Sequence, residues 1–311
     1  MSRATRAIAI TRRLILLGLF TSFVGCNKTA KPSYQVFASP DDAGNGLLAA
    51  AKSGDPNTIL AVFGPDSKDI VLSGDPVQDT NTASRFAAAY GMMHRWRKMP
   101  DDSQILLIGA DNFAFPIPLK KNATGQWYFD VAAGREEILA RRIGRNELAV
   151  IDVCGALADA EAEYFSQHYG GTKQYAQKFI SDTGKQNGLY WESQQDQPRS
   201  PLGPLAAFAT TEGYNVKPDS HMPFHGYYFH MLSRQGSHAQ GGAKDYVIDG
   251  KMVDGFAFVA YPAEYRNSGV MTFIINQDGV LLEKDLGNNT TEMATAMTEF
   301  DPDPGWRPVE Q

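Results

Sequence analysis

Residues 146–169 have the sequence NELAVIDVCGALADAEAEYFSQHY, with the residue spacing of a long amphipathic helix. Apolar and small residues recur there in steps of three and four, and in a helix these steps share one face. That predicted face is Leu148, Ile151, Gly155, Ala158, Ala162, Phe165 and Tyr169, and the polar stripe is Asp152, Asp159 and Glu163. Small side chains in the middle of the face let a flat partner approach closely. We therefore predict a long helix packed on a sheet, with Asn146 as its N-cap.

The segments on either side of this helix predict an α+β fold with helices packed on antiparallel sheets. Further helices are expected at residues 41–52, 82–98, 134–143 and 175–180, and strands at residues 104–109, 113–120, 127–131, 226–232, 256–261, 270–275 and 280–286. Asn81 or Thr82 is the expected cap of the helix at 82–98, and Gly144 suits the left-handed end of the helix at 134–143. Residues 276–279, NQDG, are a turn signal between two apolar runs, so the last two strands are expected to form a hairpin.

The composition is that of a globular chain with an acidic mature part. The sequence has 311 residues, of which 43% are hydrophobic, enough for one large or two modest cores. Residues 1–25 hold four of the 29 basic residues and no acidic residue, which leaves 25 basic against 35 acidic residues, a net charge of −10. Phosphate backbones bind basic surfaces, so this balance argues against nucleic acid as a partner.

Residues 1–25 have the features of the signal peptide of an exported lipoprotein. Arginines at the start precede an apolar run, residues 14–24, that is too short for a stable membrane span. Residues 23–26, FVGC, resemble the lipobox of bacterial lipoproteins, which implies a lipid on Cys26. Asn27 follows the lipobox cysteine, and a residue of this kind there resembles the signal of lipoproteins that are sorted to the outer membrane. We therefore expect a lipid anchor at the periplasmic side of the outer membrane. Residues 11–16 also resemble a twin-arginine export motif, so two export routes stay open.

Two other patterns are expected to have no chemical role. Cys154 lies among apolar residues of the long helix and is predicted to be a buried hydrophobe rather than a reactive thiol. Residues 44–49, GNGLLA, match the dinucleotide fingerprint in letters only, because Asp41 and Asp42 precede them and would repel a phosphate. We expect no nucleotide and no other cofactor.

The aromatic and glycine-rich segment at residues 224–242 is the predicted binding site. Its candidate residues are Phe224, His225, Tyr227, Tyr228, His230, Arg234 and His238. The first hypothesis is a non-enzymatic binding or assembly factor of the cell envelope that uses this segment on a protein or polymer partner. The alternative is a periplasmic hydrolase or metal-dependent enzyme that uses the histidine cluster, with a nearby carboxylate such as Asp245 or Asp249. The histidines of that cluster are His221, His225, His230 and His238.

The sequence also lacks the short motifs of common hydrolases and nucleotide enzymes. It has no nucleophile elbow, phosphate loop, paired metal cysteines or His-Glu zinc motif. Pro223 argues against the helix on which His221 and His225 would share a metal ion. The predicted organisation is a signal peptide at 1–25, a tether at 26–35, α+β parts at 36–133 and 134–300, and an irregular tail at 301–311.

Several motifs resemble the bacterial domain-of-unknown-function 2950 family. They are residues 41–52, FPIPL at 115–119, WYFD at 127–130, GREEI at 134–138, RRIGRNEL at 141–148, GYYF at 226–229, GVMTF at 269–273 and DGV at 278–280. The resemblance covers nearly the whole mature chain and implies no known activity, substrate or catalytic residue. The order of motifs in the second half is also similar to the globular heads of type IV pilin-like proteins, which implies a helix on an antiparallel sheet. The charged residues before the long helix depart from the continuous apolar helix by which pilins polymerise.

Overall fold

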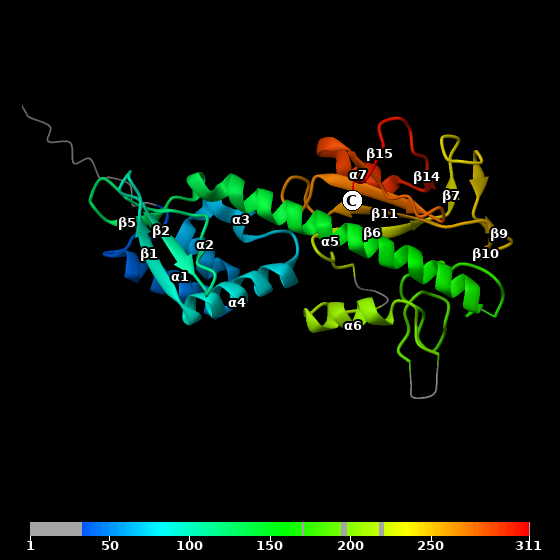
Figure 1. The fold of residues 1–311 in the computed structure, drawn as a ribbon, viewed down its shortest axis with the longest axis horizontal. Helices are drawn as coiled ribbons and strands as arrows, with labels where there is room; N and C mark the ends of the chain where they lie inside the picture. Colours follow the sequence, from blue (N-terminus) through cyan, green and yellow to red (C-terminus); the bar gives the residue numbers. More distant parts are fainter. Residues whose placement is uncertain (1–32, 170, 194–197, 218–220, 311) are drawn as a thin grey trace, which may run out of the picture. The chain divides into compact units, whose positions relative to one another are not determined.

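The computed structural model describes residues 33–169, 171–193, 198–217 and 221–310, and its secondary structure is α+β with mainly antiparallel sheets, as predicted (Figure 1). The predicted signal peptide, Cys26 and most of the tether lie outside these residues. Within the described residues, no helix combines the length and the apolar character needed to cross a bilayer.

The chain begins with helices whose starts follow from local capping. They are α1 (Pro40–Ser53), α2 (Pro56–Phe63), α3 (Lys68–Val71) and α4 (Pro76–Met92), with the 3-10 turn η1 (Pro65–Ser67) after α2. Ser39, Asp55 and Asp75 each accept a backbone N–H of the first turn that follows, and a proline occupies the first helical position of α1, α2 and α4. Proline suits that position because its fixed φ is already helical and its missing N–H has no partner to lose.

The helix predicted at residues 82–98 is wrong at both ends. Helix α4 begins six residues earlier, with Asp75 as its cap in place of Asn81 or Thr82, and it ends at Met92. Residues His94–Lys98 form strand β1, which pairs antiparallel with β2 (Gln104–Ile108). Interstrand hydrogen bonds therefore determine the conformation of this basic segment, and its charges do not complement a helix dipole.

The first sheet has the strand order β1-β2-β4-β5, with β3 (Phe113–Ala114) also paired to β2. The predicted strand at residues 113–120 is divided between β3 and β4 (Leu119–Lys121), because Pro116 and Pro118 between them have no N–H for a ladder. Strand β5 (Trp127–Phe129) follows a turn in which the Gly125 N–H donates to the Asn122 carbonyl at 3.0 Å. The main core of this part includes Phe37, Phe63 and Phe129, whose rings meet edge to face.

Helix α5 (Val131–Gln167) is one continuous helix of 37 residues, and it replaces the two helices predicted at 134–143 and 146–169. Its N-cap is Asp130, whose side chain accepts the N–H of Ala133. Asn146 is therefore not a cap: it lies in mid-helix, with only 2% of its surface exposed. Gly144 does not end a helix, because its backbone is in the right-handed helical conformation and not in the left-handed one.

The buried face of α5 is displaced by about one residue from the predicted face. Its buried apolar side chains are Val150, Val153, Cys154, Leu157, Ala160 and Tyr164, whereas Leu148 is 67% exposed. In the middle of the helix the displaced face contributes Val153, Cys154 and Leu157 to the core, where the predicted face has only Gly155 and Ala158. Contacts between α5 and strands β11 and β12 confirm that the long helix packs on the second sheet.

The second sheet is antiparallel and has the strand order β15-β13-β12-β11-β6. Its strands are β6 (Tyr227–Leu232), β11 (Ala257–Pro262), β12 (Met271–Asn276), β13 (Leu282–Asp285) and β15 (Arg307–Pro308). The predicted hairpin is confirmed by the β12 and β13 register, in which Met271 lies opposite Asp285. The tail predicted to be irregular contributes β15 to the edge of this sheet.

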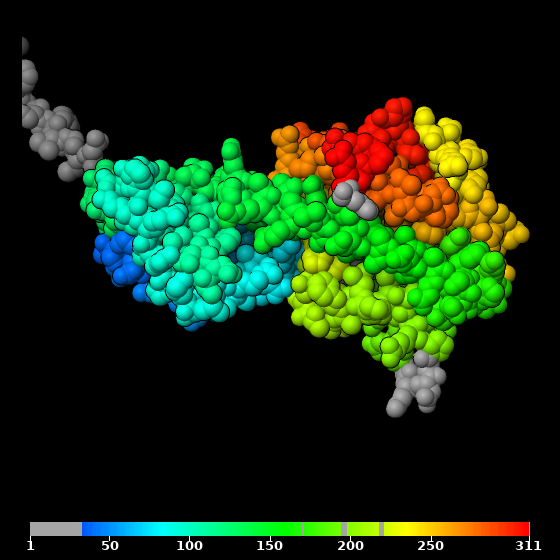
Figure 2. Space-filling model, in the orientation of Figure 1, coloured from blue at the N-terminus to red at the C-terminus, as the bar shows by residue number. Residues whose placement is uncertain are grey.

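Shorter elements surround this sheet. They are α6 (Gly203–Thr211), β7 (Arg234–Gln235), β8 (Lys244–Asp245), β9 (Val247–Ile248), β10 (Lys251–Met252), η2 (Gly287–Asn289), α7 (Thr290–Ala296) and β14 (Glu299–Phe300), of which β14 and β7 form a parallel pair. Residues 175–180, predicted as a helix, instead make isolated bridges from Tyr175 to Met252 and from Ile180 to Tyr190. In Figure 2 the green surface of α5 lies beside the orange strands and the yellow-green α6.

Candidate functional site

A large apolar pocket lies among the first helices, the first sheet and the N-terminal half of α5. Its volume is about 710 Å³, within the range of small-molecule sites. Side chains of α1, α2, α3 and α4 form one side, and β2, β3, residues 115–117 and α5 form the rest. Ala51, Ala83 and Ala89 face the pocket from α1 and α4. These short side chains leave unfilled the space that larger residues would occupy.

Four arginines line the same pocket, one from α4 and three from α5. They are Arg85, Arg141, Arg142 and Arg145. The three on α5 share one side of the helix because they are spaced by one, three and four residues. The Arg141 guanidinium lies 5.0 Å from the centre of the Phe113 ring and its Nε donates to Glu137 at 2.6 Å. The other two guanidiniums have fewer polar contacts. Arg145 donates to the Arg141 carbonyl, and Arg85 has no hydrogen bond or ion pair within the described residues.

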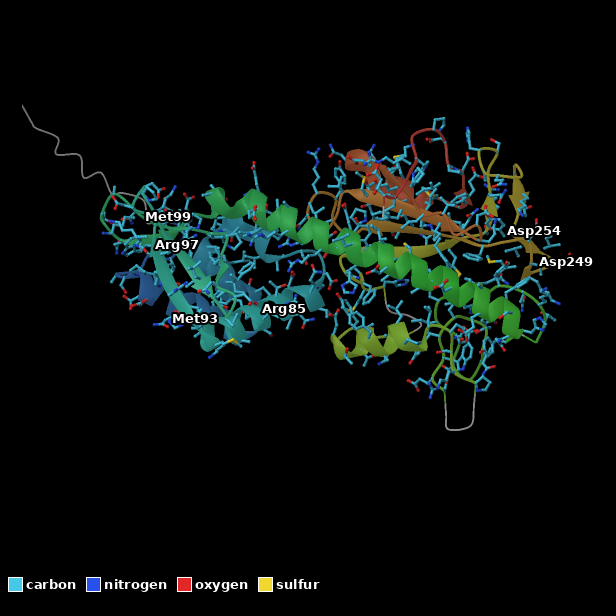
Figure 3. The ribbon with its side chains drawn as sticks, viewed as in Figure 1. Arg85, Met93, Arg97, Met99, Asp249 and Asp254 are labelled. Atoms are coloured by element: carbon cyan, nitrogen blue, oxygen red, sulfur yellow. The ribbon has the colours of Figure 1, made fainter. Side chains whose placement is uncertain are left out.

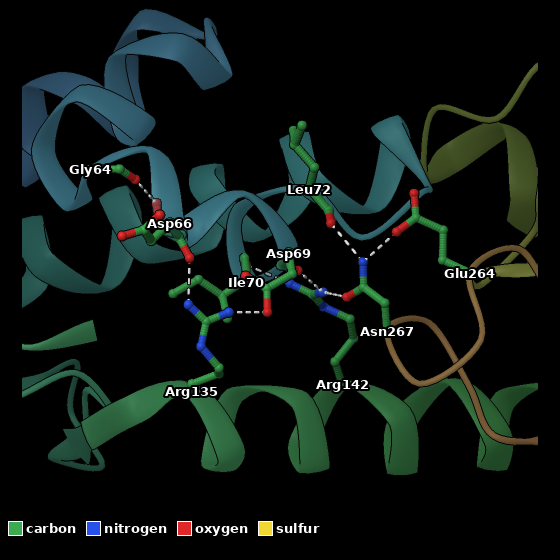
Figure 4. A network of polar contacts seen from close by, with 10 residues as sticks. Gly64, Asp66, Asp69, Ile70, Leu72, Arg135, Arg142, Glu264 and Asn267 are labelled. Carbon is green, nitrogen blue, oxygen red and sulfur yellow. Dashed lines mark hydrogen bonds and ion pairs between the residues drawn. The ribbon is translucent and has the colours of Figure 1, made fainter. Parts of the chain in front are cut away.

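Arg142 differs from the other three arginines because it is buried and donates to three acceptors (Figure 4). Its guanidinium donates to the carbonyls of Asp69 and Ile70 and to the Asn267 side chain. Asn267 in turn donates to the Leu72 carbonyl at 2.9 Å and to Glu264. Burial lowers the pKa of Arg142, and the charge of Asp79 partly offsets that effect. The residue therefore joins α5 to the loop before β12 and to the end of α3.

A second group of buried contacts lies one turn further along α5. Gln78 donates to the Asn146 side chain at 2.7 Å, and Asn146 donates to the Ser268 carbonyl at 2.8 Å. Glu147 accepts the backbone N–H groups of Val270 and Met271, both at 2.9 Å. The RRIGRNEL motif at 141–148 thus supplies the polar contacts between α5 and the loop and strand at residues 267–271.

The pocket contains one carboxylate, that of Asp79. Both of its oxygens accept the backbone N–H of Ser73, at 3.1 Å each. Burial raises the pKa of Asp79, while the Ser73 contacts and the charge of Arg142 act in the opposite direction. The Oε1 atom of Gln78, also in the lining, is buried without a hydrogen-bond partner among the described residues.

The histidines predicted as a possible cluster are held by different elements. His230 lies on β6 with Nε2 2.9 Å from the Met297 carbonyl, and His238 lies 2.9 Å from the Asp301 carboxylate. His225 has Nε2 3.7 Å from Glu212, and burial lowers the pKa of its imidazole. His221 is exposed before β6. Among the described residues, no three His, Cys, Asp or Glu side chains come together in a way that would hold a metal ion.

The other residues of the predicted binding segment are also dispersed. Tyr227 is fully buried and donates to the Met271 carbonyl, and Arg234 pairs with Glu299 at 3.2 Å. Phe224 and Tyr228, together with His221, line a smaller hollow of about 240 Å³ beside α6. The structure therefore brings part of this segment to a separate apolar hollow and commits the rest to intramolecular contacts.

Sequence reasoning missed the pocket and its arginines as a site. Arg141, Arg142 and Arg145 are visible as a basic group in one helix, but Arg85 is more than fifty residues away in the sequence. The signal available was Ala89, a small residue four positions after Arg85 and therefore on the same helix face. Only the tertiary fold places α4 and α5 as walls of one pocket and so brings the two groups to it.

The fold and the pocket define a class of protein: an α+β chain whose long helix contributes both to an apolar pocket and to the packing of an antiparallel sheet. Within that class, residues 34–309 match the family described as "Protein of unknown function (DUF2950)". The match covers most of the chain, so the protein belongs to this family, as the sequence resemblance predicted. Neither the curated proteins nor the solved structures give a match. The likeness to pilin heads stays a prediction.

Proposed function

We propose that the chain is an exported cell-envelope lipoprotein that binds a small apolar ligand and does not transform it. Lipid on Cys26 would hold it at the periplasmic side of the outer membrane. The observation that carries the binding proposal is the pocket of about 710 Å³ with predominantly apolar walls. Concave apolar sites of this size suit small molecules, whereas protein partners are usually met by flatter surfaces.

The polar groups in the pocket favour binding over catalysis. Arginine side chains stay protonated at physiological pH and so do not exchange protons with a substrate. The Asp79 carboxylate accepts the single Ser73 amide N–H in a bifurcated contact, at 3.1 Å to each oxygen, which fixes its orientation. Charge and hydrogen bonding at this site can orient a ligand, while general acid–base chemistry would need a group free to gain or lose a proton.

A probe titration with a pocket-filling variant tests the binding proposal. The chain from residue 27 to 311 keeps every described element and is titrated with the neutral apolar fluorophore N-phenyl-1-naphthylamine. Ala83→Phe places a large ring in the pocket and is expected to weaken probe binding at least about tenfold, as displaced apolar contact would. Ala88→Phe is the matched control, since Ala88 is exposed on the same helix and does not line the pocket.

The outcome is read together with thermal unfolding of both variants. Equal probe affinity of Ala83→Phe and the unmodified chain, with both folded, contradicts the proposed site. If Ala83→Phe fails to fold, Thr82→Phe takes its place, because Thr82 also lines the pocket and is more exposed than Ala83. The lipid anchor is tested separately by mass spectrometry of the N-terminal peptide from the membrane fraction, where an unmodified Cys26 would contradict it.

A further inference from the structure

The pocket has more positive charge at its edge than the protein neutralises. Arg142 is held by its buried acceptors and lies near the Asp79 charge, and Arg141 pairs with Glu137. Arg85 and Arg145 have no carboxylate partner within the described residues. Partial burial is the main cause that lowers the pKa of Arg145. The nearby positive charges of Arg85 and Arg141 lower it further.

Arg85 and Arg145 are both exposed and neither is committed to a protein carboxylate within the described residues, so their guanidiniums are available to a ligand of opposite charge. The guanidinium fork matches the oxygens of a carboxylate or a phosphate and can donate two parallel hydrogen bonds to either. The walls beyond the arginines are apolar, with alanines, isoleucines and phenylalanines from α1, α2, α4 and β2. A ligand that satisfies both regions has an anionic head and an apolar chain.

We propose that the pocket binds a single-chain anionic amphiphile of the fatty-acid type, with its head at Arg85 and Arg145 and its chain in the apolar cavity. This inference rests on the proposed function and adds the chemical class of the ligand. The shared chemistry is an oxyanion on a long acyl chain, which a free fatty acid supplies as a carboxylate and a lysophosphatidate as a phosphate. A neutral molecule with a chain of the same length makes the apolar contacts of the cavity but no charged contact with the arginines.

Displacement of the naphthylamine probe distinguishes the contribution of the anionic head to affinity from that of the apolar chain. Palmitic acid, hexadecanol and a palmitoyl lysophosphatidate are each titrated below their aggregation concentrations into the probe-loaded chain. We expect the acid to displace the probe at a concentration at least about tenfold lower than the alcohol, since a charge-assisted contact to even one guanidinium is worth that ratio. The relative affinity of acid and lysophosphatidate shows which oxyanion the arginines prefer.

The variant Arg85→Gln with Arg145→Gln is expected to remove the preference for the acid while leaving hexadecanol binding within about twofold. Arg97→Gln is the matched control, because Arg97 is an exposed arginine on β1 outside the pocket lining, and it is expected to keep the preference (Figure 3). Added salt is expected to weaken binding of the acid and not of the alcohol, because only the charged contact is screened.

The possible failures of the two proposals differ. Equal affinity for acid and alcohol in the unmodified chain, or a preference that survives loss of both arginines, overturns the anionic-head inference and leaves the apolar site standing. Suppose that Ala83→Phe excludes the probe, but neither the acid nor the alcohol displaces it from the unmodified chain. That result overturns the proposal of a single-chain ligand. Absence of probe binding altogether overturns both the inference and the proposed function.

Discussion

The replacement Arg142→Met tests whether the buried polar junction of α5 stabilises the fold. Methionine preserves most of the length and apolar volume of the side chain but removes all of its donors. Arg142 is 7% exposed, and its guanidinium serves three acceptors: the carbonyls of Asp69 and Ile70 and the side-chain oxygen of Asn267. In the variant these acceptors stay in place without a donor.

The expected loss follows from the number of stranded acceptors. A buried acceptor left without its hydrogen bond costs about 1–3 kcal/mol. Removing a buried charge returns part of that cost, because the guanidinium no longer has to be kept out of water. We therefore expect Arg142→Met to lower the free energy of unfolding by about 3 kcal/mol, at the lower end of the sum for three acceptors.

Urea unfolding at neutral pH, followed by circular dichroism, measures this difference. Arg135→Met is the matched control, because Arg135 lies on the same helix two turns earlier and pairs with Asp69, but its side chain is 32% exposed. Partly exposed ion pairs contribute about 0–1 kcal/mol, so the control is expected to lose no more than that. The slope of the unfolding free energy against urea is expected to be the same in both variants, since neither changes the area that unfolding exposes.

A loss of less than about 1 kcal/mol for Arg142→Met would refute this reasoning. So would a loss equal to that of Arg135→Met. Either result would mean that the three acceptors find water or other donors in the variant, and that the junction between α5 and the loop at residues 264–268 contributes little to stability.

Two further predictions concern buried or strained positions. The Glu161 carboxyl is fully buried and accepts the Ala176 N–H, and burial raises its pKa well above 4.5. The cost of ionising this buried group in the folded state is therefore absent below pH 4.5 and grows as the pH rises towards the native pKa. Glu161→Gln is therefore expected to gain stability relative to the unmodified chain as the pH rises above 4.5, by up to about 1.4 kcal/mol per pH unit until the native pKa is reached; urea unfolding at a series of pH values measures the difference, and a pH-independent difference would contradict this. Gly226→Ala is expected to cost about 3 kcal/mol, because at φ 75° its Cβ would lie 2.5 Å from the buried Asn146 amide. Gly279→Ala, at φ 74° with open space around it, is expected to cost about 1 kcal/mol, and equal thermal shifts for the two glycines would show that the close contact is relieved cheaply.

Local chemistry was sufficient for several elements of this fold. The NQDG turn at residues 276–279 fixes the β12–β13 hairpin because its backbone preference and the flanking apolar runs act within a few residues of each other. The start of α1 follows in the same way from Ser39 and Pro40, whose effects on the first turn need no distant partner. The exposed positions of Asp152, Asp159 and Glu163 also agree with the predicted polar stripe.

The sequence by itself determined the antiparallel α+β class, the C-terminal hairpin and the membership of the family, since turns, caps and short motifs act over short distances. Tertiary structure alone decided which face of α5 is buried, because both candidate faces are apolar at helical spacing and only the packing against the second sheet distinguishes them. It also decided that residues 94–98 form a strand, since the pairing partner β2 competes with the end of α4. The pocket arises in the same way: Arg85 on α4 and Arg145 on α5 line one pocket only in the folded chain, so no local pattern contains the site.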